Sequence, residues 1–227
     1  MTRLAIFDID GTIFRSSLAI ELLDALIQEG IFPVEATKQY ERFYTNWLDR
    51  KGTYEDYVRA VVEAFNSNMK GVRGDEFMDV CWKVASFHRN RVYRYTRDLL
   101  SQFKEKKYYL LAITGSPTFV AQPFCKYLGF TKVYGTMFEL DKKGIFTGNV
   151  LHEDLIHDKA RVLEHAVGKE KLTLKGSVGV GDTESDIPFL KMVDKPICFN
   201  PNQKLYRYAK RKRWSIVVER KDMIYHL

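Results

Sequence analysis

The sequence Arg3-Leu-Ala-Ile-Phe-Asp-Ile-Asp-Gly-Thr-Ile-Phe14 opens the chain with an apolar run that ends in two carboxylates. Residues 4–7 are typical of a buried strand, and Asp8 and Asp10 follow it directly. Burying aspartates is costly unless a cation lies between them. Because α/β proteins bind ligands at the carboxyl edge of a parallel sheet, a divalent cation is one interpretation. The alternative is a solvated turn, since Asp, Gly and Thr are common turn residues.

The 227 residues are 45% hydrophobic and 29% charged, which is typical of an ordinary soluble globular protein. This length allows one core, or a core with a modest inserted domain. No stretch is long and apolar enough to span a bilayer, and Asp8 interrupts the first apolar run, which argues against a signal peptide. Cys81, Cys125 and Cys198 are widely spaced in apolar segments and predict reduced thiols in a cytoplasmic protein.

The formal net charge is +7, and positive residues concentrate in segments 81–97 and 204–213. Such charge is typical of proteins that bind nucleic acid or an anionic surface. In the second segment Leu205, Tyr208 and Ala209 recur at helical spacing, which favours a solvated helix face. A basic entrance for a phosphorylated small molecule explains the charge equally well, so composition leaves these alternatives open.

Residues 15–95 show helical periodicity throughout and carry no strand pattern. Ser16 or Ser17 can cap the first of these helices. Aromatic and apolar residues recur at i, i+3, i+4, i+7 and i+8 across residues 40–48. The sequence Thr53-Tyr-Glu-Asp56 resembles a capping box at the start of another helix. The pattern predicts a small helical domain inserted into a larger one.

Helix and strand alternate from Thr96 onward. Expected strands cover residues 108–113, 177–180, 197–199 and 215–218, and expected helices cover residues 97–106, 118–128, 159–167, 187–193 and 203–212. Residues 133–150 alternate around Asp141-Lys-Lys-Gly144 and predict a β-hairpin. Strands separated by helices favour a parallel sheet covered on both faces. We therefore predict an α/β fold with a Rossmann-like parallel sheet, formed by residues 1–14 and 96–227, and an inserted all-helical cap, residues 15–95.

Polar residues that suit phosphate chemistry follow three of the expected strands. They are Asp8 and Asp10 after the first, Thr114 after the second, and Asp182 and Asp186 after the third, with Lys159 at the start of a helix. If the three loops converge, they combine carboxylates, a hydroxyl, backbone amides and a cation. That set suits phosphoryl transfer, in which catalysis is largely positioning and charge neutralisation. A carboxylate can attack phosphorus to give an aspartyl-phosphate.

Four segments resemble the motifs of a known family. They are Phe-Asp-Ile-Asp-Gly-Thr (7–12), Ile-Thr-Gly-Ser (113–116), Lys159 and Gly-Asp-Thr-Glu-Ser-Asp (181–186). In order and spacing they look like the four motifs of the haloacid dehalogenase (HAD) superfamily of phosphohydrolases, and they bracket nearly the whole chain. The helical insertion between the first two motifs is similar to the cap of the phosphoserine-phosphatase-like branch, subfamily IB.

The resemblance implies a role for each matched position. Asp8 would be the nucleophile, and Asp10 would protonate the leaving alcohol and then activate water. Thr114 and the Gly115 amide would hold phosphate oxygens, with Lys159 neutralising charge. Asp8, the Asp10 carbonyl and Asp182 would bind Mg²⁺, with Asp186 hydrogen-bonded behind these ligands. Taken from the residues alone, Lys159 as a surface lysine and Asp186 as a helix cap remain alternatives.

The sequence departs from phosphoserine phosphatases where those enzymes carry the acidic residue that binds the substrate amine. The matching position lies near Ser17, and Glu21, a turn further on, is expected to face elsewhere. This argues against free phosphoserine as substrate. Arg89, Arg91 and Arg94 either bind a second anionic group or form a basic hinge, and we favour the hinge. The aromatic residues of 40–48 favour cap core over a stacking platform, although one or two could face the site.

The sequence thus predicts a cytoplasmic, Mg²⁺-dependent phosphatase that hydrolyses a small phosphomonoester through an aspartyl-phosphate. Its expected partner is a small phosphorylated metabolite, with no membrane partner and nucleic acid disfavoured, and the sequence does not specify an oligomeric state. One alternative is a phosphotransferase or mutase that uses the same intermediate. Another is a basic nucleic-acid-associated phosphatase or binding protein, whose retention on nucleic acid would depend on salt.

Overall fold

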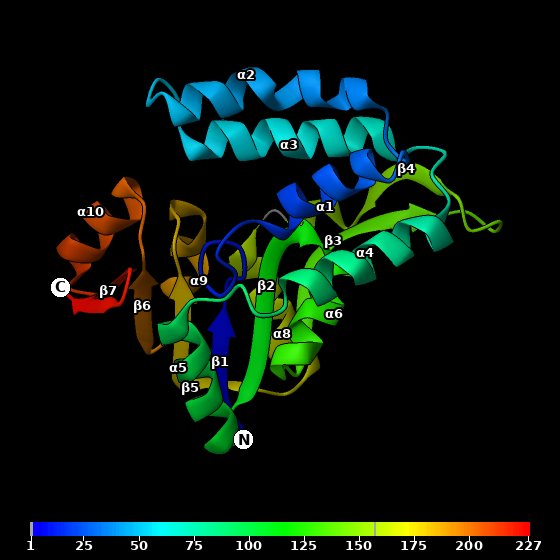
Figure 1. Cartoon of the computed structure of the whole chain (residues 1–227). Coiled ribbons are helices and arrows are strands. Elements are labelled where there is room, and N and C mark those ends of the chain that lie inside the picture. The colour runs from blue at the N-terminus through cyan, green and yellow to red at the C-terminus, as the bar shows by residue number, and fades with distance from the viewer. Residues whose placement is uncertain (1, 157) are drawn as a thin grey trace.

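The computed structural model describes residues 2–156 and 158–227 (Figure 1). The predicted α/β core includes Met1 and His157, and these two residues lie outside the described ranges. Within these ranges, eight strands form one sheet in the order β4-β3-β2-β1-β5-β6-β7-β8. The strands are β1 (Arg3–Phe7), β2 (Tyr109–Pro117), β3 (Lys132–Leu140), β4 (Phe146–Leu151), β5 (Thr173–Gly181), β6 (Lys195–Phe199), β7 (Ser215–Arg220) and β8 (Met223–His226). Neighbouring strands are parallel except for the antiparallel pairs β3–β4 and β7–β8 at the two edges.

Helices cover both faces of this sheet and also form a layer beyond its end. They are α1 (Leu18–Gln28), α2 (Thr37–Leu48), α3 (Tyr54–Met69), α4 (Gly74–His88), α5 (Arg94–Glu105), α6 (Thr118–Leu128), α7 (Glu153–Ile156), α8 (Lys159–Lys169), α9 (Ile187–Leu190) and α10 (Gln203–Lys212), with short 3₁₀ turns η1 (Val34–Ala36) and η2 (Glu184–Asp186). Among the described helices, none has the length and apolar content needed to cross a membrane.

Strand β1 lies at the centre of the sheet and is buried on both faces. Its side chains alternate, so that Ala5 and Phe7 join the hydrophobic cluster that includes α5 and α6. Leu4 and Ile6 join the opposite cluster, which includes α8, α9 and α10. This arrangement confirms the predicted α/β fold with a mostly parallel, two-sided sheet.

Helices α1 to α4 lie between β1 and β2 in the chain, as the helical periodicity predicts. In Figure 1, α2 and α3 form a layer beyond the carboxyl ends of the parallel strands. Helix α3 begins at the predicted capping box, in which the Thr53 hydroxyl accepts from the Asp56 N–H at 3.1 Å. The division of the chain into a core and a separate cap domain at residues 15 and 95 stays a prediction.

The β3–β4 hairpin joins the inserted helices to the sheet. Its turn follows the predicted Asp141–Gly144 sequence, and the Asp141 carboxylate accepts from the N–H groups of Lys143 and Ile145. Phe138 packs on Phe65 of α3, with ring centroids 5.5 Å apart. An aromatic cluster therefore continues from the hairpin into the inserted helices.

Candidate active site

Asp8 is the first residue after β1, and only 4% of it is exposed. Its Oδ1 accepts a hydrogen bond from Lys159 Nζ at 2.6 Å. The same ammonium donates to Asp186 Oδ1 at 2.5 Å, so it bridges two buried carboxylates. Burial lowers the pKa of Lys159, but the two carboxylates outweigh this effect and hold the pKa above its ordinary value. Lys159 is therefore a charged part of the site and not a surface lysine.

Lys159 reaches Asp8 because α8 begins at the carboxyl edge of the sheet. Asp158 caps this helix, and its side chain accepts from the N–H groups of Ala160 and Arg161. The cap fixes the first turn of α8, from which the lysine side chain extends toward β1.

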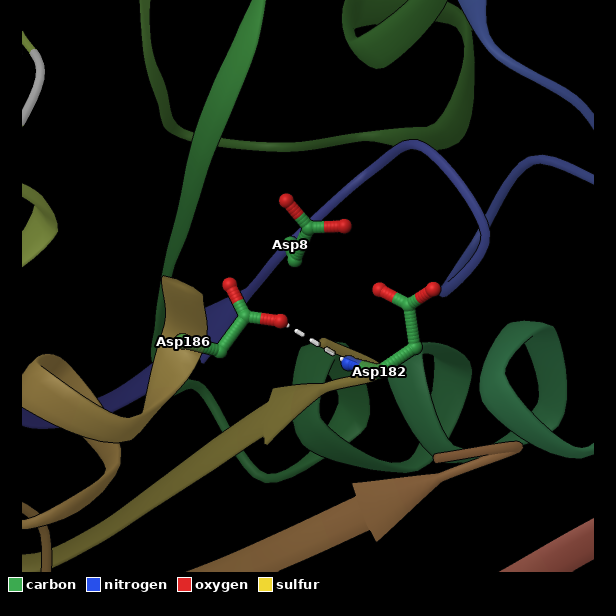
Figure 2. Close-up of side chains that lie close together, drawn as sticks. All are labelled: Asp8, Asp182 and Asp186. Atoms are coloured by element: carbon green, nitrogen blue, oxygen red, sulfur yellow. Dashed lines mark hydrogen bonds between the residues drawn. The ribbon is translucent and has the colours of Figure 1, made fainter. Parts of the chain in front are cut away.

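The loop after β5 supplies the other two carboxylates of the group. Asp186 Oδ2 accepts from the N–H groups of Asp182 at 2.9 Å and Thr183 at 3.1 Å, and Figure 2 shows the first of these bonds. A Cβ on Gly181 would lie 2.5 Å from Asp186 Oδ2, so only glycine fits against the carboxylate. Asp186 thus caps the 3₁₀ turn η2, which is one alternative that the sequence leaves open for it. It also accepts a hydrogen bond from Lys159 within the candidate site.

Three carboxylates gather around one space at the end of the sheet. Oxygens of Asp8, Asp182 and Asp186 all lie within 4.8 Å of one another (Figure 2). Burial raises the pKa of Asp8 to about 7, against the opposing effect of the Lys159 charge. Burial and the neighbouring carboxylates also raise the pKa of Asp182 well above its ordinary value. One lysine does not balance this buried negative charge, and hard oxygen donors in this arrangement fit Mg²⁺.

Asp10 faces a different set of partners. Its Oδ1 accepts from the N–H of Leu18 at 2.6 Å, and its Oδ2 accepts from the hydroxyls of Thr114 at 2.6 Å and Ser116 at 2.8 Å. Burial raises the pKa of Asp10, although these hydrogen bonds oppose the rise. The predicted cap of α1, the Ser17 side chain, makes no capping hydrogen bond. The Asp10 carboxylate instead accepts from the N–H of Leu18, the first residue of the helix.

The second predicted motif is adjacent to this site. Thr114 is buried and its hydroxyl contacts Asp10, while Gly115 is exposed and its carbonyl accepts from the Thr136 hydroxyl at 2.7 Å. Phosphate binding by Thr114 and Gly115 stays a prediction. Ser116, for which the motif predicts no separate role, also accepts from the N–H of Ala19 at 3.0 Å and so joins the motif to α1.

The first turn of α3 approaches the site from the inserted helices. Tyr54 lines the same cavity as Asp182, and burial, with the charges of Asp10 and Asp182, raises the pKa of its hydroxyl. The neighbouring Glu55 accepts from the Asn202 side chain at 2.5 Å, and Asn202 also donates to Glu184 in the acidic loop. Sequence reasoning misses these residues because no local pattern shows which turn of a helix will meet a loop distant in the chain.

The predicted aromatic core of the cap is only partly correct. On α2, Tyr40 is buried, but Phe43 and Tyr44 are 39% and 40% exposed. Tyr40, Tyr44 and Trp47 line a cavity of about 740 Å³ that also includes Asp182 and Gly11. Helix α2 packs on α3, and Tyr40 joins the hydrophobic cluster that includes Ala5 and Phe7 of β1, so this side chain belongs to the core and also borders the cavity.

Glu21 faces away from the cavity, as the sequence predicts, and the arginines near it have partners within the chain. Glu21 accepts from Arg91 at 2.7 Å and pairs with His88 at 3.1 Å, and it does not line the cavity. Arg94 donates to the Asp222 carbonyl at 3.1 Å, and Arg89 lies over the Tyr127 ring. Arg91 lines the cavity, but its bond to Glu21 leaves less of its charge for a second anionic group.

A central strand that ends in a lysine-paired aspartate, beside a second acidic loop, defines a class of α/β hydrolases. The family model of haloacid dehalogenase-like hydrolases matches residues 5–191, and the chain belongs to this family. The match confirms the family that the four sequence motifs predict.

Relatives of known name share most of this chain. A histidinol-phosphatase of Neisseria meningitidis serogroup C (strain 8013) is 25% identical over 230 residues, covering 96% of this chain and 99% of its own length. A phosphoserine phosphatase of Mycobacterium tuberculosis (strain ATCC 25618 / H37Rv) is 24% identical over 225 residues, covering 95% of this chain and 70% of its own.

Solved structures share the fold. A Bordetella pertussis Tohama I protein of unknown function has a TM-score of 0.75 at 20% identity, with 95% of this chain and 98% of that chain covered. A phosphoserine phosphatase in the form of a phospho-aspartyl intermediate analogue has a TM-score of 0.62 at 19% identity, covering 97% and 95%. At these identities, the likeness shows the common architecture of sheet and helices.

Proposed function

We propose that this protein is a Mg²⁺-dependent phosphatase that hydrolyses a small phosphomonoester through an aspartyl-phosphate on Asp8. One observation carries the proposal. Asp8 lies at the end of the central strand, 2.6 Å from the Lys159 ammonium and beside the carboxylates of Asp182 and Asp186. A nucleophile, a fixed cation and a site for a divalent cation are thus combined in one buried place.

The metal site is proposed from the donors that the chain offers. Asp8 and Asp182 would hold Mg²⁺ through carboxylate oxygens, with the backbone carbonyl of Asp10 as a third protein ligand. When bound, Mg²⁺ would neutralise phosphate charge and orient the phosphoryl group toward Asp8. Asp186 positions Lys159 and the Asp182 backbone through its two oxygens.

In the first step, an Asp8 oxygen attacks phosphorus and the bond from phosphorus to the ester oxygen breaks. Asp10 donates a proton to the departing alcohol, and the pKa raised by burial favours its protonated form. The hydroxyls of Thr114 and Ser116 can either donate or accept, so they orient Asp10 in both protonation states. Lys159 balances the charge that develops on the phosphoryl oxygens.

In the second step, water attacks the aspartyl-phosphate while Asp10 takes up a proton from this water. The bond from phosphorus to the Asp8 oxygen breaks, which releases inorganic phosphate and restores the carboxylate. The two steps leave Asp8 and Asp10 in their starting states, as a catalyst requires.

The comparisons support a small phosphorylated metabolite as the partner, since the named relatives are phosphatases of histidinol phosphate and phosphoserine. Free phosphoserine remains disfavoured, because Ser17 is buried and the Glu21 carboxylate is paired. The predicted cytoplasmic location rests on Cys81, Cys125 and Cys198, which are free and buried.

Release of phosphate from a panel of phosphomonoesters, with and without Mg²⁺, tests this function. The panel includes histidinol phosphate, phosphoserine, sugar phosphates, nucleoside monophosphates and p-nitrophenyl phosphate. We expect Mg²⁺-dependent release that Asp8→Asn abolishes while Asp79→Asn, an exposed substitution on α4, preserves it. Activity retained in Asp8→Asn would refute the nucleophile. Phosphate delivered to an added alcohol in preference to water would instead identify a phosphotransferase.

A further inference from the structure

The cavity beside the catalytic carboxylates has an aromatic wall. Its volume is about 740 Å³, and Gly11 and Asp182 line it at the catalytic end. Six aromatic side chains also line it: Tyr40, Tyr44, Trp47, Tyr54, Tyr57 and Tyr93. A cavity that adjoins the phosphate site is the place for the alcohol part of a substrate, which the rings would surround.

The rings form one continuous surface around Tyr57. Its ring centroid lies 5.2 Å from that of Tyr44, 6.1 Å from that of Tyr54 and 5.8 Å from that of Trp47, which is stacked on it. The faces of aromatic rings carry negative electrostatic potential and attract organic cations. The wall therefore suits a positively charged group better than a carboxylate.

A carboxylate reinforces this preference. Asp24 of α1 also lines the cavity, and its Oδ1 accepts from the Tyr40 hydroxyl at 2.9 Å. In the described part of the chain, no Lys, Arg or His forms an ion pair with Asp24, whereas Glu21, one turn earlier, pairs with His88 and Arg91. Asp24 thus offers the cavity a carboxylate that forms no ion pair with a cationic side chain among the described residues.

The opposite charge lies near the catalytic end. Arg15 belongs to the loop that follows Asp10, and its guanidinium carbon lies 5.1 Å from the centroid of the Tyr93 ring. Arg15, Tyr93 and Asp182 all line the cavity, so the Arg15 guanidinium and the Asp182 carboxylate border the same space. The cavity is positive beside the phosphate site and negative at Asp24.

The distance between the two ends limits the length of the ligand. The N–H of Leu18 lies 2.6 Å from Asp10, and Asp24 is six residues further along α1. At 1.5 Å per residue, the two ends are roughly 9 Å apart along the helix axis. A cation one or two carbon atoms from the ester oxygen is too close to the phosphate to reach Asp24.

We propose that this cavity binds the alcohol part of a phosphomonoester that carries an organic cation several bonds from the ester oxygen, held by the aromatic wall and by Asp24. The proposal rests on the phosphatase function and names the class of its substrate. Tyr44 and Trp47 contact the cation through their ring faces, the buried Tyr57 packs behind them, and Asp24 binds the cation as an ion pair.

Esters of matched length test the class. We expect kcat/KM for 6-aminohexyl phosphate to exceed that for n-hexyl phosphate and for 2-aminoethyl phosphate by about tenfold each, as a cation in contact with aromatic rings and a carboxylate gains of this order. Asp24→Asn should reduce the ratio of aminohexyl to hexyl ester toward one. Asp79→Asn, an exposed aspartate on α4 outside this cavity, should keep the ratio. Equal rates for the charged and neutral esters would overturn the proposal and leave the phosphatase function intact.

A binding measurement separates the cation site from turnover. Calorimetric titration with hexyltrimethylammonium should show binding that Asp24→Asn and Trp47→Leu each weaken about tenfold, with n-hexanol binding far more weakly. Binding of this kind without turnover of any ester would remove the phosphatase function but retain the cation site. Equal binding by the wild type and Asp24→Asn would overturn the cation site.

Discussion

Two aspartates in one short segment have contrasting surroundings. Asp8 lies against the Lys159 ammonium, whereas Asp10 lies among two hydroxyls and a backbone N–H. A cation stabilises a carboxylate and favours nucleophilic attack, while neutral partners allow a buried carboxyl group to hold a proton. The proposed roles of Asp8 as nucleophile and Asp10 as proton donor therefore rest on different environments for the same side chain.

The buried carboxylates make the response to Mg²⁺ depend on pH. Burial raises the pKa of Asp8 to about 7 in the metal-free protein, and the pKa values of Asp10 and Asp182 are raised too. The folded state therefore holds protons that the unfolded chain releases above about pH 4, so the stability of the metal-free protein falls as pH rises toward 7. Because Mg²⁺ favours ionised carboxylates, it should raise Tm more at pH 8 than at pH 5, by about 2–4 °C for each kcal/mol of difference. Thermal unfolding in EDTA and in Mg²⁺ measures this, and equal shifts at both pH values would contradict it.

Ser116 should matter for stability as well as for Asp10. Its hydroxyl donates to Asp10 and accepts from the N–H of Ala19, so Ser116→Ala leaves the Ala19 N–H without this partner and removes one of the two hydroxyl donors to Asp10 Oδ2. We expect a loss of about 1–3 kcal/mol in the free energy of unfolding, measured by urea denaturation. Ser67→Ala on α3, whose exposed hydroxyl bonds only to the Glu63 carbonyl among its described contacts, is the matched control. A loss in Ser116→Ala no greater than in this control would refute the bridging role.

At the scale of elements, the sequence predicts interior segments better than edges. Helices α6 and α10 have the predicted bounds, because their apolar periodicity is regular and their ends carry clear signals. Strand β8 escapes prediction, since Ile224 is its one partly buried residue and the strand pairs only with β7 at the sheet edge. The helix expected over 187–193 is shorter in the structure, where α9 follows the 3₁₀ turn η2 directly and ends at Leu190.

The first turn of α3 is held to the acidic loop by a shared polar contact. Asn202 donates to both Glu55 and Glu184, and burial and the Glu184 carboxylate raise the pKa of Glu55. A proton on Glu55 relieves repulsion between the two acids, and this contribution to stability is lost as pH rises through the raised pKa. The contact between α3 and the loop should therefore loosen at higher pH.

Hydrogen exchange measures this loosening directly. We expect amides in the first turns of α3 to exchange about tenfold faster in Glu55→Ala than in the wild type at pH 6, with the difference shrinking at pH 9 as the wild-type contact weakens. Glu63→Ala, an exposed substitution on the same helix, is the control. Unchanged protection in Glu55→Ala would show that packing alone positions α3.

At the scale of the whole molecule, the order of the strands and the cavity lie beyond what the sequence can predict. Apolar strands such as residues 177–180 have no feature that specifies a neighbour, so the alternation of helix and strand predicts a parallel sheet without its order. The candidate site residues could be proposed from the sequence because motifs place them at strand ends. Asp24 and Tyr57 reach the cavity only through the packing of α1 and α3 beside the site, which no local pattern encodes.

The chain returns from the inserted helices to the sheet at α5, and β7, next to the edge strand β8, contacts the start of this helix. The buried Glu219 of β7 accepts from the N–H groups of Arg94 and Tyr95 at the start of α5. Glu219→Gln removes a charge from a helix N-terminus and should cost about 1–2 kcal/mol in the free energy of unfolding, measured by urea denaturation. Glu41→Gln on the exposed surface of α2 is the control. An effect no larger than that of the control would show that β7 does not anchor α5.

The separation of Asp8 from Lys159 by 151 residues has a consequence for the newborn chain. At roughly 5–20 residues per second, a ribosome adds this stretch in about 8–30 s, during which the first strand has neither β5 beside it nor its ammonium partner. Until then the acidic end of that strand stays hydrated, and the helices that follow it emerge first. If the proposed site is correct, competence for catalysis arrives late in translation, and we expect prematurely terminated chains that end before residue 182 to be inactive however well their helices form.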